Sequence, residues 1–180
     1  MKVIETALPG VLILEPKVFS DSRGFFLESF NERTMAEAGI RERFVQDNHS
    51  FSARNVLRGL HYQLRPQGKL VRVAVGEIFD VSVDLRRSSP TFGRWYGTNL
   101  SEANKQMLWV PPGCAHGFRV LSESAHVLYK VTDFYDPEAE RTIAWNDPTL
   151  KIEWQQLTTP PTVSVKDSLG VPFQEAEAFA

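Results

Sequence analysis

The sequence predicts an all-β protein built from antiparallel strands. Its 180 residues contain many short segments rich in apolar side chains, separated at regular intervals by turns that contain glycine and proline. Only one stretch in the first half has the pattern of a helix. Short strands spaced in this way are typical of an antiparallel sandwich or barrel, of which the jelly-roll barrel is one closed form. A chain of this length is expected to form one domain, residues 1–180.

In the first half, strands alternate with turns and one short helix. The strands are expected over residues 11–15, 24–30, 43–50, 56–63 and 69–75. A turn at 21–24 precedes the second of them, and Asn31 is expected to cap a helix over 32–38 that Gly39 ends. The loop at 65–68 and the pair Gly76-Glu77 are each predicted to close a hairpin.

In the second half, the clearest strand covers residues 78–85. Apolar residues at every second position, from Phe79 to Leu85, form one face, and Asp80, Ser82 and Asp84 form the other. Further strands are expected over 95–100, 106–110, 114–120 and 125–134. From Asp147 onward, proline and polar residues predict loops with one or two short helical turns.

Composition excludes several classes of protein. The net charge of −2 gives no general surface for nucleic acid or membranes. Cys114 is the only cysteine, so neither an internal disulfide nor a four-thiolate zinc site can form. The first residues resemble no secretory leader, and no apolar run approaches the length of a membrane span. The sequence therefore predicts a cytoplasmic enzyme or binding protein.

The stretch Arg58–Gln63 is the first candidate for a functional site. It places His61 in an apolar strand, with Lys69 at the start of the next strand. Histidine, with an ordinary pKa of ~6.5, suits a base at neutral pH. Basic residues at these two strand ends favour an anionic substrate that has a proton to lose. On its own, however, His61 is more typical of a buried histidine with a satisfied hydrogen bond.

Strand parity brings further titratable groups to the same interior. Tyr129 shares a face with Val127 and Val131, and Lys69 shares one with the valines that follow it. With His61 and His116, these side chains would place four titratable groups in one cavity, which packing alone does not explain. Arg58 lies three positions from His61, so both reach the interior only if a bulge separates them, and Gly59 is the expected place.

A metal site is not encoded in the sequence. Barrels of this kind often hold a metal through two histidines separated by one residue, but here the run is His61-Tyr62-Gln63. Zinc or iron needs at least three converging ligands, and no short-range spacing supplies them. We therefore expect no metal.

These motifs together resemble the dTDP-4-dehydrorhamnose 3,5-epimerases, the RmlC-type sugar-nucleotide epimerases. The matching stretches cover nearly the whole chain: 21–28, 46–48, 58–61, 67–72, 111–118, 129–130, 145–148 and 166–167. The resemblance implies a cupin-type jelly roll, a homodimer, no cofactor, and a dTDP-4-keto-6-deoxy sugar as substrate. Protons at C3 and C5 of such a sugar are acidified by the C4 ketone, so each can be removed and returned on the other face.

The resemblance also implies roles for single residues. His61 would be the base, oriented by Asp167; Lys69 would stabilise the enolate, and Tyr129 would return the proton. The residues expected to bind substrate are Arg23, Phe26, Glu28, Gln46, Asp47, Asn48, Arg58, His116, Tyr135, Glu140 and Lys166. Three alternatives use the same motifs: an epimerase acting at only one carbon, an isomerase that moves the ketone between C3 and C4, and a non-catalytic cupin that binds sugar nucleotides.

Overall fold

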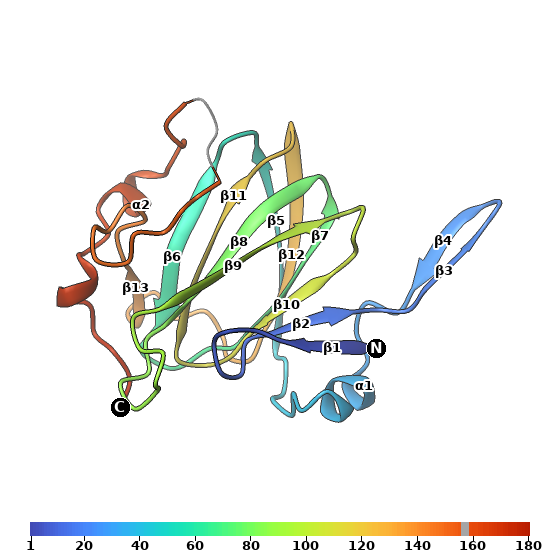
Figure 1. Ribbon diagram of the computed structural model, residues 1–180, viewed down its shortest axis with the longest axis horizontal. Coiled ribbons are helices and arrows are strands. Elements are labelled where there is room, and N and C mark those ends of the chain that lie inside the picture. The colour runs from blue at the N-terminus through green and yellow to red at the C-terminus, as the bar shows by residue number, and fades with distance from the viewer. Residues whose placement is uncertain (156–158) are drawn as a thin grey trace.

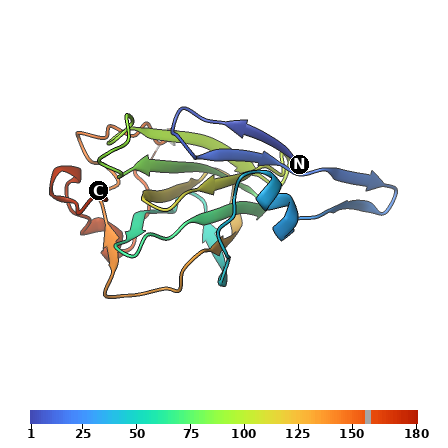
Figure 2. The same cartoon turned by 90° about the horizontal axis from the view of Figure 1, so that it is seen from below.

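Two antiparallel sheets face each other and form a barrel, in a computed structural model that describes residues 1–155 and 159–180 (Figure 1). The six-stranded sheet has the order β1-β2-β10-β7-β12-β5, and the five-stranded sheet has the order β13-β6-β11-β8-β9. A separate hairpin, β3-β4, projects from the barrel in both views (Figures 1 and 2). The predicted all-β jelly roll is confirmed.

Most predicted elements are found close to their expected places. The strands are β1 (Lys2–Glu5), β2 (Leu12–Glu15), β3 (Val18–Asp21), β4 (Gly24–Leu27), β5 (Gln46–Ala53), β6 (Leu57–Gln63), β7 (Lys69–Val75), β8 (Glu77–Asp84), β9 (Trp95–Ser101), β10 (Met107–Val110), β11 (Cys114–Val120), β12 (Ser124–Val131) and β13 (Glu140–Thr142). The helices are α1 (Glu32–Glu37), α2 (Val165–Ser168) and the 3-10 turn η1 (Phe173–Glu175). The side chain of Asn31 caps α1 as expected, by accepting hydrogen bonds from the amides of Arg33 and Thr34.

Both predicted hairpins in the middle of the chain are wrong. β6 belongs to the five-stranded sheet and β7 to the six-stranded sheet, and the chain returns to the five-stranded sheet at β8. The loop at 65–68 and the turn at Gly76 therefore carry the chain across the barrel instead of joining paired strands. As a result, the end of β6 and the start of β7 face each other across the interior.

Each face of the five-stranded sheet packs against a different apolar cluster. The inner face contributes Ile78 and Phe118 to a cluster with Val71 and Val127 of the opposite sheet. The outer face, with Val81 as one of its residues, packs under the C-terminal segment in a second cluster. This segment runs over the outside of the sheet and carries α2 at the left of Figure 1.

A bulge interrupts β6 at the expected place. His61 pairs with His116 of β11, and Arg58 pairs with Phe118, so three steps along β6 correspond to two along β11. Gly59 lies in this interval with φ 134°, and a Cβ built on it would lie 2.6 Å from the Cα of Gly117. Only glycine fits this backbone conformation and this close approach without strain.

We predict that Gly59→Ala destabilises the fold more than Gly39→Ala does. Gly39 also has a positive φ, 87°, but a Cβ there would meet nothing within 4 Å. The Gly39 variant should lose only the conformational term, about 1–2 kcal/mol, whereas the Gly59 variant should lose about 1–3 kcal/mol more through the clash. Urea unfolding of both variants measures the difference; equal losses would contradict the close packing of β6 against β11.

Candidate active site

One cavity, of about 260 Å³, brings together three of the predicted catalytic residues and four of the predicted substrate-binding residues. It opens between the two sheets, and its walls come from β5, β6, β7 and β12, together with residues next to and within β13. Its lining residues are Gln46, Asn48, His61, Tyr62, Gln63, Gln67, Lys69, Tyr129, Tyr135 and Glu140. The crossing from β6 to β7 explains why His61 and Lys69 meet here although neither strand pairs with the other.

His61 is hydrogen-bonded through Nε2 to the carboxylate of Asp167. Asp167 lies on the short helix α2, where its backbone amide donates to the Ser164 side chain that caps the helix. The Asp167 side chain is 4% exposed and that of His61 is 27% exposed, so the histidine faces the cavity and the carboxylate lies behind it. The pairing that the resemblance implied is therefore present.

Burial and hydrogen bonding act in opposite directions on this pair. Burial lowers the pKa of His61 below its ordinary value, although the hydrogen bond to Asp167 raises it in part. Burial would raise the pKa of Asp167, but the His61 hydrogen bond and the Ser164 cap leave that pKa below its ordinary value. Asp167 is thus ionised at neutral pH and His61 is neutral, which is the form that a general base needs.

Lys69 supplies a buried cation at the start of β7. Its Nζ lies 3.4 Å from the carbonyl oxygen of His61, to which it donates. Burial lowers the pKa of Lys69 to about 8, against the carboxylates of Glu140 and Asp80, which raise it. The ammonium therefore remains charged at neutral pH in a partly dry site, where a charge stabilises an oxyanion strongly.

Tyr129 brings a phenol to the same cavity from the opposite sheet. As parity predicted, it packs beside Val127 in the inner cluster. Burial raises the pKa of Tyr129, and the nearby Arg58 offsets part of that shift. The hydroxyl therefore carries its proton at neutral pH, as a proton donor must.

The bulge at Gly59 directs Arg58 to the inner face of the opposite sheet. The Nε of Arg58 donates to Ser52 Oγ at 2.9 Å, and Nη2 donates to the carbonyl oxygen of Phe51 at 3.1 Å, both on β5. The residue remains exposed, so its guanidinium is accessible from solvent.

A polar group at the cavity edge links four of the residues expected to bind substrate. Gln46 Nε2 donates to Asn48 Oδ1 at 2.9 Å, and the Tyr135 hydroxyl donates to Glu140 Oε2 at 2.8 Å. The amide of Tyr135 also donates to Gln46 Oε1 at 3.2 Å. Glu140 forms an ion pair with Lys166 of α2, so β5, β13 and the C-terminal segment meet at this edge.

Seven of the eleven predicted substrate-binding residues do not line this cavity: Arg23, Phe26, Glu28, Asp47, Arg58, His116 and Lys166. Asp47 points to the other face of β5, where it forms an ion pair with Lys130 at 2.8 Å. Arg23 and Phe26 lie on the β3-β4 hairpin, exposed, and Glu28 follows directly after it. The hairpin and α2 are at opposite ends of the long axis of the molecule (Figure 1).

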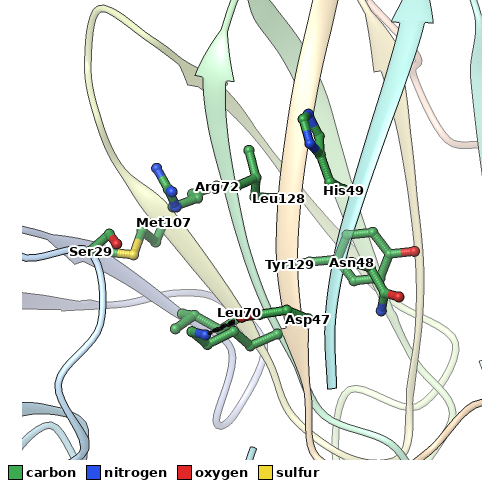
Figure 3. Close-up of a pocket in the computed structure, with 10 residues that line it drawn as sticks. Ser29, Asp47, Asn48, His49, Leu70, Arg72, Met107, Leu128 and Tyr129 are labelled. Carbon is green, nitrogen blue, oxygen red and sulfur yellow. Dashed lines mark hydrogen bonds and ion pairs between the residues drawn. The ribbon is translucent and has the colours of Figure 1, made fainter. Parts of the chain in front are cut away.

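A second cavity, of about 280 Å³, lies on the outer face of the six-stranded sheet. Figure 3 shows Leu128 and Arg72 beside it, with the ring of Tyr129 directed away from them. Its lining includes Tyr129 and Asn48, which it shares with the first cavity, but neither His61 nor Lys69.

Sequence reasoning missed one residue next to the site, Asp80. His116 Nε2 lies 2.9 Å from Asp80 Oδ1 and 3.0 Å from Oδ2, and both side chains are buried. The signal was the polar face of residues 78–85, which carries Asp80. In the described part of the chain, no three histidine, cysteine or acidic side chains are grouped so as to hold a metal ion. No helix there is long and apolar enough to cross a membrane.

Comparison with known proteins identifies the family. The family described as dTDP-4-dehydrorhamnose 3,5-epimerase matches residues 5–175. The chain is 59% identical over 181 residues to the dTDP-4-dehydrorhamnose 3,5-epimerase of Pseudomonas aeruginosa and 57% identical over 182 residues to that of Shigella flexneri, with 99% of every chain covered.

A solved structure gives the same result. The dTDP-6-deoxy-D-glucose-3,5-epimerase of Legionella pneumophila Philadelphia 1, in complex with dTDP-4-keto-L-rhamnose, matches with a TM-score of 0.94 at 49% identity. The match covers 98% of this chain and 94% of that chain. Sequence and structure therefore agree, and the chain belongs to the dTDP-4-dehydrorhamnose 3,5-epimerase family.

Proposed function

We propose that this chain inverts C3 and C5 of dTDP-4-dehydro-6-deoxy-D-glucose and so forms dTDP-4-dehydro-L-rhamnose, a step of dTDP-L-rhamnose biosynthesis. The observation that carries the proposal is the meeting of three groups at one cavity: the His61–Asp167 pair, the Lys69 ammonium and the Tyr129 phenol. Family membership supplies the substrate class. The reaction needs neither a metal nor a cofactor, and residues 1–180 act as one catalytic domain in the cytoplasm.

The chemistry follows from the protonation states of these groups. Neutral His61 takes the proton from the carbon next to the ketone, and the electron pair of that C–H bond moves to the C4 oxygen as an enolate. The Lys69 ammonium stabilises the developing oxyanion, and it does so below a pH of about 8, where it is charged. Tyr129 then donates its proton to the opposite face of the carbon, which inverts the centre.

The nucleotide is bound at the cavity edge and by Arg58. Arginine suits bidentate contact with the diphosphate, and Lys166 adds a second cation there. Gln46, Asn48, Tyr135 and Glu140 form the polar group that recognises thymine and deoxyribose. His116 assists at the sugar, and Asp47, which points away from the cavity, contributes only through its position on β5.

Arg23, Phe26 and Glu28 act through a homodimer. In one protomer these residues lie far from the cavity, on and after a hairpin whose aromatic side chains are exposed: Phe19, Phe25 and Phe26 are 52%, 60% and 69% exposed. An exposed apolar arm is typical of a surface that binds another chain. We propose that the hairpin of one protomer covers the cavity of its partner and places Arg23 at the diphosphate there.

Replacing the base should abolish exchange at both carbons. His61→Ala, incubated with dTDP-4-keto-6-deoxyglucose in heavy water, should incorporate no deuterium at C3 or C5, because one base serves both. Asp167→Asn should reduce exchange less, since it only disturbs the tautomer and basicity of His61. NMR of the product measures both carbons. Wild-type exchange at a single carbon would assign the chain to the single-site epimerases, and residual exchange at one carbon in His61→Ala would require a second base.

Replacing the acid should separate exchange from inversion. Tyr129→Phe should keep part of the His61-dependent deuterium exchange and lose most of the inverted product, because the proton can return only to the face from which it left. Tyr135→Phe is the matched control and should keep inversion, since Tyr135 lies at the cavity edge with Glu140. Exchange and product stereochemistry are measured on the same samples; full inversion by Tyr129→Phe would place the acid elsewhere.

Arg58→Ala and Arg23→Ala should each weaken nucleotide binding by ~1.5–3 kcal/mol, the value of a charged hydrogen bond.

A shared site also predicts complementation. When inactive His61→Ala chains are mixed with Arg23→Ala chains, half of the dimers are mixed, and one site in each combines an intact His61 with an intact Arg23. Activity should return to about a quarter of the wild-type value if protomers exchange at random. Absence of complementation in proven mixed dimers would show that the hairpin serves its own protomer.

A further inference from the structure

We propose that Asp80 is a positioning residue of this site: it fixes the tautomer of His116, so that Nδ1 faces the sugar as a hydrogen-bond acceptor, in a second carboxylate–imidazole pair beside His61 and Asp167. The inference rests on the proposed epimerisation and adds a residue to it. Asp80 was expected only as part of the polar face of a strand, and its position in the sheet gives it this role.

The register of the five-stranded sheet places Asp80, His116 and His61 on three neighbouring strands. β11 lies between β8 and β6, and on it His116 is the register partner of His61 on one side and of Ser82 on the other. Asp80 precedes Ser82 by two residues on β8, on the same face of the strand. His116, on the middle strand β11, thus lies between Asp80 on β8 and His61 on β6.

Burial and hydrogen bonding show which side chain of the Asp80–His116 pair could meet a ligand, and through which ring nitrogen. Asp80 is 0% exposed and His116 is 7% exposed, so of the two side chains only the imidazole keeps any exposed surface. Both oxygens of Asp80 lie within 3.0 Å of His116 Nε2. An ionised carboxylate only accepts hydrogen bonds, so Nε2 carries a proton. Within the described residues, Nδ1 has no protein partner and is the ring atom available to a ligand.

A buried carboxylate that accepts from one ring nitrogen fixes which nitrogen carries the proton, so the other nitrogen faces a ligand as an acceptor. Lys69 is the cation already described beside His61, and the Asp80 carboxylate also favours its charged form. His116 would then accept at Nδ1 from a hydroxyl of the sugar on the side of β11, while Lys69 donates from β7. Removing the carboxylate should leave nucleotide binding unchanged, because the nucleotide-binding residues lie on other strands.

Asp80→Asn tests the proposal, because the amide keeps the shape of the side chain but offers a donor as well as an acceptor. We expect kcat for inversion to fall by about 10- to 100-fold, the usual effect of removing a carboxylate that orients a functional imidazole. Affinity for dTDP should stay unchanged. Ser82→Ala, a buried neighbour on the same face, is the matched control and should keep the wild-type kcat.

Two readouts separate this role from a purely structural one. Nitrogen NMR of His116 should show a proton fixed on Nε2 in the wild type and a mixture of tautomers in Asp80→Asn. In a double-mutant cycle, Asp80→Asn should cost nothing further in a His116→Asn background. An unchanged kcat, an unchanged tautomer or full additivity would overturn the proposal.

The outcomes also distinguish this proposal from the proposed function. If the wild type incorporates no deuterium from heavy water, the epimerisation itself fails, whereas the tautomer of His116 still reports on Asp80. If the wild type is active and Asp80→Asn equals it, only the role of Asp80 fails. If Asp80→Asn does not fold, His116→Asn decides: loss of turnover with retained dTDP affinity supports the pair, and full turnover overturns it.

Discussion

The hydrogen bond between His61 and Asp167 joins the barrel to the C-terminal segment. His61 belongs to the barrel, and Asp167 lies on a helix of four residues that could not be stable alone. Parallel bridges from Val56 to Thr162 and from Ile143 to Val171 hold the C-terminal segment against the five-stranded sheet. Since a buried carboxylate is costly without a partner, the bond stabilises the docked segment, and it also raises the pKa of His61 against the effect of burial.

Local patterns in the sequence predicted the strands and their inner faces well. Parity alone placed Tyr129 and Lys69 on the apolar interior, and the conflict between Arg58 and His61 located the bulge at Gly59. The two hairpins could not be predicted correctly, because a turn sequence such as Gly76-Glu77 reverses the chain whether the next strand pairs with the last or joins the opposite sheet. That choice depends on packing between strands far apart in the chain.

Asp80 and Arg23 show where reasoning from sequence stops. An alternation of apolar and polar residues looks the same whether the polar face meets water or a buried cavity, and in β8 it meets the interior: Asp80, Ser82 and Asp84 are all buried. Arg23 matched the motif of a substrate-binding residue, but in this chain it lies on the exposed β3-β4 hairpin and does not line the cavity that contains His61. Both questions concern long-range neighbours, which only three-dimensional structure supplies.

The order in which the chain is synthesised gives the C-terminal segment another consequence. Every strand of the barrel up to β13 precedes α2, so a nascent chain contains His61 long before it contains Asp167. A product interrupted between β13 and α2 would keep a histidine at the cavity wall, but the carboxylate that fixes its tautomer would be missing. Asp167 therefore reaches His61 only after translation has passed α2, and in the proposed mechanism a chain truncated before α2 lacks the carboxylate that orients its base.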